Sequence, residues 1–241
     1  MRSPGGFPSG ITSENVLSNR SARYPALADL YRAVGLVDKQ GVGVDRMYQN
    51  MITLGHRPPI IEEVSGPFVE TTLVGGPPVV QVLDLVSRIV PVARQRDYRI
   101  AIILHILMSR AFVTEDVVAH GLQAGTEQAR NALEAASQTT VDGEPLVVLH
   151  RRGTWILGAS SRSVLADKLP YLGTDPASME EVALLWLNEV GDMATSDVMV
   201  LCGVSRGTAK KCVDSMNDEG AVEVVGGGRS TRYRLAEQSK K

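Results

Sequence analysis

Aromatic residues, cysteine and an excess of charge of either sign are scarce in this sequence. Of 241 residues, 5% are aromatic and two are cysteine, and 25 Lys and Arg nearly balance 27 Asp and Glu to a net charge of −2. Two cysteines cannot form a disulfide framework and fit a reducing compartment. A chain without a basic excess also lacks the usual signature of a nucleic-acid-binding domain. The composition thus excludes a disulfide-stabilised secreted scaffold and, for the chain as a whole, argues against nucleic acid.

Long apolar runs are missing as well. No uninterrupted stretch approaches the ~20 apolar residues that a membrane helix needs, and the Gly- and Pro-rich residues 1–10 contain no apolar segment of a secretory signal. We therefore expect a cytoplasmic protein with no membrane partner. An apolar content of 44% is that of an ordinary globular chain, and the length is enough for two or three domains.

Clusters of Gly and Pro divide the chain into three segments. The first break is residues 75–78, and the second contains Pro170, Gly173 and Pro176. We expect domains at residues 1–76, 77–170 and 176–236. The first segment is predicted to hold a Pro- and Gly-rich opening loop, two helices and one or two strands. It begins so abruptly that it looks like the end of a larger domain.

The second and third segments repeat one order of elements. Each has a strongly apolar helix, a short helix, a turn with glycine, a third helix and two strands with a basic turn between them. The first copy has expected helices at residues 100–108, 114–120 and 126–137 and strands at 146–149 and 154–157. The second copy has expected helices at residues 182–190, 195–201 and 205–216 and strands at 221–225 and 231–235.

An offset of 80 residues aligns the apolar positions of the two copies without gaps across the helices. On the third helix, Ala129, Ala132, Leu133 and Ala136 align with Ala209, Cys212, Val213 and Met216. These positions follow i, i+3, i+4 and i+7 and so share one helix face. Three helices followed by a hairpin form the plan of a winged helix-turn-helix. The expected fold class is mainly α with small β: a truncated α/β module followed by two tandem winged helix-turn-helix domains.

The second copy presents basic residues on the third helix and on the hairpin. Lys and Arg at such places neutralise phosphates, and small residues let a helix N-terminus approach DNA closely. The DNA contacts predicted in this copy are Ser205, Arg206, Thr208, Lys210, Lys211, Arg229, Arg232 and Arg234. The first copy offers only Arg151 and Arg152 on its hairpin, while Glu127 and Glu134 on its third helix repel phosphate. We therefore expect the second copy to be the main DNA reader.

Three stretches of the first segment resemble a known bacterial family. SPGGFPSGIT (3–12), RYPALA (23–28) and GLVDKQGVGVDRM (35–47) are similar to the C-terminal module of RecG-like ATP-dependent helicase and transcriptional regulators that carry a Schlafen AlbA-type domain at the N-terminus. The resemblance covers residues 1–75. It implies a transcriptional regulator with winged helices behind a divergent nucleotide-binding module that is distantly similar to the GHKL ATPase fold.

The same resemblance suggests ATP as a cofactor, with Gly41 and Gly43 in the glycine loop that covers phosphates. No Asp precedes Gly5 or Gly6, as the adenine-binding loop of that fold would require. The family's helix with the magnesium-binding Asn and the catalytic Glu would lie before Met1. The resemblance thus gives a weak basis for ATPase activity in this chain.

The sequence therefore predicts a DNA-binding transcriptional regulator that is not an enzyme. Its expected partners are double-stranded DNA and a second copy of itself, because paired half-sites suit such readers. No catalytic or metal-binding residues are predicted, since the four histidines have no ligand-like spacing. Two alternatives remain open: a nucleotide-responsive sensor or ATPase module, and a protein-docking or dimerisation adaptor.

Overall fold

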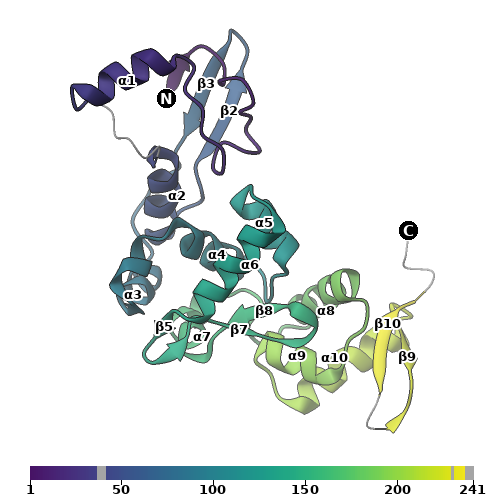
Figure 1. Cartoon of the computed structure of the whole chain (residues 1–241). Coiled ribbons are helices and arrows are strands. Elements are labelled where there is room, and N and C mark those ends of the chain that lie inside the picture. Colours follow the sequence, from purple (N-terminus) through teal and green to yellow (C-terminus); the bar gives the residue numbers. More distant parts are fainter. Residues whose placement is uncertain (37–41, 229–230, 237–241) are drawn as a thin grey trace.

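A computed structural model describes residues 1–36, 42–228 and 231–236. Two of the predicted site residues, Gly41 and Arg229, lie outside this part of the chain. The three segments follow one another in space, from a small sheet near the N-terminus to a hairpin near the C-terminus (Figure 1).

The N-terminal segment folds around a three-stranded antiparallel sheet. Its strands are β1 (Arg2–Pro4), β2 (Ile60–Val64) and β3 (Phe68–Thr72), in the order β1-β3-β2. The prediction of a plain loop at the N-terminus is wrong for β1, because the backbone of residues 2–4 pairs with β3. Helices α1 (Pro25–Ala33) and α2 (Gly43–Thr53) agree with the two predicted helices. Helix α2 buries Tyr48 and Ile52, whereas α1 buries no residue.

The middle segment contains the three predicted helices and the predicted hairpin. These are α4 (Tyr98–Ser109), α5 (Glu115–Leu122), α6 (Thr126–Ser137), β7 (Val147–Leu149) and β8 (Trp155–Leu157), with the short 3₁₀ turn η2 (Arg151–Gly153) between the strands. Several short elements were not predicted from the sequence. They are α3 (Val80–Ser87), β4 (Ile89–Val90), η1 (Val92–Arg96), β5 (Thr140–Val141), β6 (Glu144–Pro145), α7 (Ala159–Leu165) and η3 (Ala166–Lys168).

The C-terminal segment repeats the arrangement without these additions. It consists of α8 (Pro176–Val190), α9 (Thr195–Cys202), α10 (Arg206–Asp218), β9 (Val222–Val225) and β10 (Arg232–Leu235). The two strands pair in antiparallel fashion. Asp175 caps α8 by accepting a hydrogen bond from the Ser178 N–H at 2.9 Å.

The backbone supports the 80-residue repeat in a way that the sequence did not show. Val113, just before α5, exchanges two hydrogen bonds with Trp155 of β8, at 2.9 and 2.8 Å. Met193, which is 80 residues further on, exchanges two with Tyr233 of β10, also at 2.9 and 2.8 Å. In each unit, a residue just before the second helix therefore pairs with the second strand of the hairpin, as a short third strand would.

The predicted buried faces are confirmed. All four apolar positions of α6 and all four of α10 are buried, with exposures between 0% and 9%. Trp186 is fully buried and packs edge-on against Phe112, with 4.9 Å between the ring centroids. The chain is mainly α-helical with small sheets, as predicted. No helix in the ranges described above is both long and apolar enough to cross a membrane.

Adjacent segments are joined by hydrogen bonds and by a shared hydrophobic core. The Leu17 N–H donates to Gln123 Oε1 at 2.9 Å, and Gln123 Nε2 donates to the Ser13 carbonyl at 3.0 Å. Leu17 itself is buried. Further along, the Tyr171 hydroxyl donates to the Leu107 carbonyl at 2.7 Å and ties the linker before α8 to α4. The hydrophobic core runs through all three segments.

Candidate nucleic-acid interface

Helix α10 presents its polar face to solvent because its apolar face is fixed in the core. Ser205 caps the helix: its Oγ accepts a hydrogen bond from the Thr208 N–H at 3.2 Å and lies 3.0 Å from the Thr208 hydroxyl. The two hydroxyl groups predicted to contact DNA thus already bond to each other and to the helix end. Arg206 and Lys211 are exposed beside them.

Lys210 is more constrained than its neighbours. Its ammonium group forms an ion pair with Asp214, one turn along the helix, and lies 3.2 Å from the Tyr233 hydroxyl and 5.8 Å from the centre of that ring. The hydrogen bond with Asp214 and the contact with Tyr233 raise the pKa of Lys210 above its ordinary value. Lys210 therefore links α10 to the hairpin, and its positive charge is paired with the carboxylate of Asp214.

The hairpin carries two further arginines of the C-terminal unit. Arg232 and Arg234 alternate along β10 with the buried Tyr233 and so share the other face of the strand. Arg234 is exposed and stands opposite Glu223 of β9 in the strand register. Arg232 is half-buried, and its Nη1 donates to the Thr231 carbonyl at 3.4 Å. Strand and helix thus place Arg206, Lys211, Arg232 and Arg234 on one unit.

The corresponding helix of the middle unit has a different charge pattern. Arg130 of α6 donates two hydrogen bonds to the carboxylate of Glu115, both at 2.9 Å, and this pair lowers the pKa of Glu115. Glu127 and Glu134 are exposed on the same helix. These acids repel phosphate, which agrees with the expected difference between the two units.

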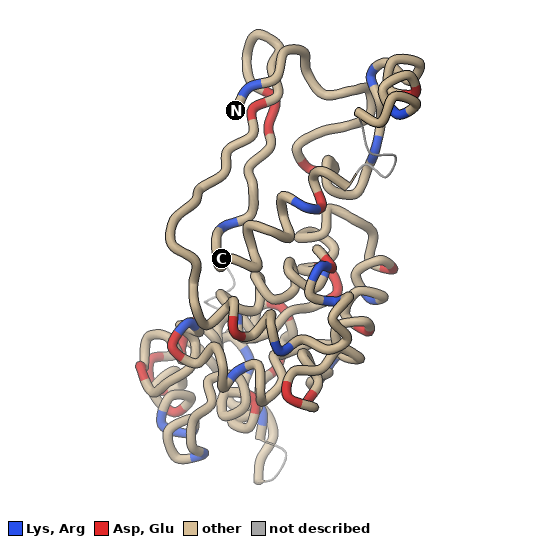
Figure 2. The backbone as a smooth tube through the Cα atoms, turned by 90° about the vertical axis from the view of Figure 1, so that its left-hand side faces the viewer, with Lys and Arg blue, Asp and Glu red and all other residues tan. Residues whose placement is uncertain are grey.

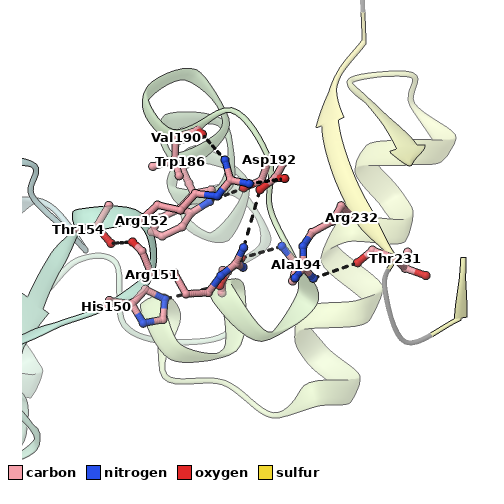
Figure 3. A network of polar contacts seen from close by, with 11 residues as sticks. His150, Arg151, Arg152, Thr154, Trp186, Val190, Asp192, Ala194, Thr231 and Arg232 are labelled. Carbon is pink, nitrogen blue, oxygen red and sulfur yellow. Dashed lines mark hydrogen bonds and ion pairs between the residues drawn. The ribbon is translucent and has the colours of Figure 1, made fainter. Parts of the chain in front are cut away.

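Arg151 and Arg152 bend back from their hairpin, although their side chains remain 30% and 48% exposed. They turn toward the C-terminal unit, where Arg151 forms an ion pair with Asp197 and Arg152 Nη2 lies 2.7 Å from Asp192 Oδ2 (Figure 3). Asp192 and Asp197 are partners that were not predicted from the sequence. The position of Asp197 as the third residue of α9 was a signal for a helix cap, but nothing in the sequence indicated an arginine from another unit.

Positions of Lys and Arg alternate with positions of Asp and Glu along the backbone in the view of Figure 2. The candidate interface is therefore defined by four basic residues of the C-terminal unit, Arg206 and Lys211 of α10 and Arg232 and Arg234 of β10, which we call the basic cluster.

The structure places Gly43 at the first residue of α2, beside a cleft of about 510 Å³. The cleft is lined by Val42, Asp45, Arg46, Gln49, Asn50, Arg96 and Tyr98. A side chain added at Gly43 would meet open space, so this glycine forms no tight cradle for a phosphate. Asp45 at the cleft is negatively charged and pairs with Arg20 at 2.8 Å. ATP binding stays a prediction from the resemblance.

Metal binding has no support among the residues with described positions, where no group of three or more His, Cys, Asp or Glu is arranged to hold an ion. Both cysteines are buried free thiols.

Comparison with known families points to a class of regulatory proteins. Residues 1–71 match the family "Putative ATP-dependent DNA helicase recG C-terminal", which confirms the resemblance stated for the N-terminal segment. Residues 174–236 match the C-terminal domain of DIP2311-like transcriptional regulators. Residues 80–166 match a family of unknown function, DUF5635. The chain thus combines a RecG-like segment with a segment similar to transcriptional regulators.

A solved relative shares almost the whole of this chain. The DIP2311 protein from Corynebacterium diphtheriae, known from a crystal structure, is 68% identical in sequence to this chain, and the two structures superpose with a TM-score of 0.89. The match covers 98% of this chain and 43% of that protein, so this chain spans less than half the length of its relative. No curated protein matches it significantly.

Proposed function

We propose that this chain is a DNA-binding transcriptional regulator whose C-terminal unit contacts duplex DNA through α10 and the β9–β10 hairpin. The observation that carries the proposal is the arrangement of α10. Its buried face fixes the helix so that Arg206 and Lys211 point to solvent, and β10 adds Arg232 and Arg234 on the same unit. The similarity of residues 174–236 to transcriptional regulators supports a regulatory role.

The proposal includes a winged helix-turn-helix arrangement in both units. It is supported by the order of three helices and a hairpin, and by the paired bridges Val113–Trp155 and Met193–Tyr233. In such folds the third helix enters the major groove and the hairpin contacts the backbone. By this reasoning α10 reads DNA, whereas α6, with Glu127 and Glu134 exposed, does not.

A salt titration tests the phosphate contacts. A fluorescently labelled random-sequence duplex is titrated with the parent protein and with Lys211→Gln at several salt concentrations. Each phosphate contact contributes about 0.9 to the slope of log K against log salt, so the variant should bind more weakly with a slope smaller by about that amount. Lys168→Gln is the matched control, because Lys168 is exposed in the linker, away from α10.

Two outcomes would contradict the proposal. The first is a parent protein whose binding to the duplex is absent or independent of salt, which would favour a protein-docking role. The second is a Lys211→Gln variant with the same slope as the Lys168→Gln control. The expected homodimer is tested separately by sedimentation of the protein with and without the duplex. We expect a dimer either in the free protein or in the complex with the duplex.

A further inference from the structure

The tip of the middle unit's hairpin contacts the C-terminal unit through a compact set of charges. Arg151 pairs with Asp197, and one of its nitrogens lies 3.8 Å from Asp192. Arg152 contacts Asp192 at 2.7 Å and donates to the Val190 carbonyl at 3.3 Å. Figure 3 shows both arginines reaching from the loop toward the C-terminal unit. We call Arg151, Arg152, Asp192 and Asp197 the arginine clasp.

The clasp is shielded from water on its acidic side. The side chain of Asp197 is 1% exposed and that of Asp192 is 13% exposed. Next to them, His150 Nε2 lies 3.5 Å from Asp197 Oδ1, and the imidazole ring packs edge-on against Trp186. Charge pairs that are partly buried are screened by salt much less than exposed pairs. Salt should therefore weaken these ion pairs less than it weakens pairs at the surface, although the side chains of Arg151 and Arg152 are 30% and 48% exposed.

Hydrogen bonds within the loop fix the backbone that carries the two arginines. The His150 N–H donates to the Thr154 carbonyl at 2.7 Å, and the Thr154 hydroxyl donates to the Arg151 carbonyl at 2.7 Å. Arg152 has a φ of 54°, in the left-handed region that non-glycine residues rarely adopt. This strained position turns the Arg152 side chain toward Asp192, so the contact depends on the loop geometry.

Each acid of the clasp is attached to an element that carries the candidate interface. Asp197 Oδ2 accepts a hydrogen bond from the Ala194 N–H at 2.7 Å and so fixes the start of α9, which packs against α10. Asp192 precedes Met193, whose backbone pairs with Tyr233 of β10. Tyr233 in turn contacts Lys210 of α10 at 3.2 Å. The middle unit is thereby connected to both sides of the basic cluster.

We propose that Arg151 and Arg152 are positioning residues that hold α9 and β10 in the orientation in which α10 binds DNA, and that they do not contact phosphates. This inference rests on the proposed DNA-binding function. It assigns the middle unit a role in DNA binding without a DNA contact of its own, and it replaces the prediction that these two arginines bind the DNA backbone.

Asp192→Asn separates positioning from simple electrostatics. The substitution removes a negative charge near the basic cluster, so electrostatics alone predicts tighter DNA binding. Loss of the clasp predicts the opposite, weaker binding by about threefold or more, with an unchanged salt slope. Asp218→Asn is the matched control, because Asp218 is an exposed acid at the end of α10, and this variant should bind DNA as tightly as the parent or more tightly.

The charge exchange provides a rescue experiment. Arg152→Glu should weaken DNA binding, and adding Asp192→Arg should restore it. Because the double variant has the net charge of the parent, this rescue supports the clasp only together with weaker binding by Asp192→Asn. If Asp192→Asn tightens binding, or if Arg152→Gln lowers the salt slope by about 0.9 as a phosphate contact would, the positioning role is wrong.

Hydrogen exchange keeps the two proposals distinguishable. In the free protein, Asp192→Asn should speed amide exchange at Met193 and in β10, which pair with each other, whereas Asp218→Asn should not. A parent protein that fails to bind the duplex overturns the proposed function, and the clasp is then judged by exchange alone. Unchanged exchange in Asp192→Asn overturns the clasp whatever the DNA result.

Discussion

Replacing Asp197 with asparagine should destabilise the protein although the shape of the side chain is kept. Asparagine retains an oxygen that can accept the Ala194 N–H, which Asp197 binds at 2.7 Å. It loses the negative charge that pairs with Arg151, in a side chain that is 1% exposed. The guanidinium of Arg151 then keeps its position without a close carboxylate partner, apart from Asp192 at 3.8 Å.

The magnitude follows from the burial of the pair. Removing one partner of a fully buried ion pair costs about 3–5 kcal/mol, because an uncompensated charge remains. The Arg151 side chain is 30% exposed, so water replaces part of the lost interaction. We therefore expect the free energy of unfolding to fall by about 2–3 kcal/mol. For a chain of this length that corresponds to a decrease in Tm of about 5–10 °C.

Thermal unfolding at neutral pH, followed by circular dichroism, measures this loss. Asp175→Asn is the matched control: Asp175 also caps a helix, through the Ser178 N–H at 2.9 Å, but it is exposed and has no arginine beside it. The control should lose clearly less. If Asp197→Asn lowers the Tm no more than Asp175→Asn does, the ion pair contributes nothing beyond the cap and the reasoning is refuted.

The same variant has a defined pH dependence. Burial raises the pKa of Asp197, but the nearby His150, the Ala194 N–H and Arg151 lower it by more, so that it lies below the ordinary value of 3.8. A group whose pKa is lowered by folding contributes stability above its unfolded pKa and loses it as the pH falls through its folded pKa. Urea unfolding should thus show a parent–variant difference that is constant near neutrality and shrinks below pH 3.8. A difference that shrinks already near neutrality would contradict this assignment.

Three further predictions concern the contacts that join the segments and the thiols. Leu17→Ala should lower the free energy of unfolding, measured by urea titration, by about 2–4 kcal/mol because Leu17 is buried. The control Leu36→Ala, at a side chain that is 74% exposed, should change it by no more than about 0.5 kcal/mol. Tyr171→Phe should cost about 1 kcal/mol by removing the hydrogen bond to the Leu107 carbonyl, and an unchanged urea midpoint would contradict that contact. Burial raises the pKa of Cys202 to about 12, so mass spectrometry should find it alkylated by iodoacetamide far more slowly in the folded protein than in urea; equal rates would show that it is accessible.

Much of the helical architecture could be predicted from the sequence. Residues 126–137 were predicted as a helix with the bounds that α6 has, because Ala129, Ala132, Leu133 and Ala136 recur at helical spacing. Strand β1 could not be predicted in this way, whereas helix α3 was missed although its buried Val82 and Leu85 have helical spacing. Strand β1 has three residues, all exposed, and exists only because β3 lies beside it. A strand of three exposed residues carries no periodicity of its own.

In the candidate site, too, some features could be predicted from the sequence and others could not. The exposure of Arg206 and Lys211 follows from the buried face of their own helix, so the sequence was sufficient. Arg151 and Arg152 were predicted to contact phosphate from their place on a hairpin, and the structure pairs them with Asp197 and Asp192, about 40 residues away in the chain. Local spacing contains no information about such a pair.

The sequence by itself determined which faces of the helices are apolar and where the two related units begin to repeat, because hydrophobic burial is specified by residue type and by a period of a few residues. It also indicated that the near-neutral net charge conceals a local basic cluster on the last unit. Only the tertiary structure decided which charges meet one another. Coulomb interactions depend on distance in space and on burial. The packing of the two units therefore gives Arg151 and Arg152 acidic partners within the protein.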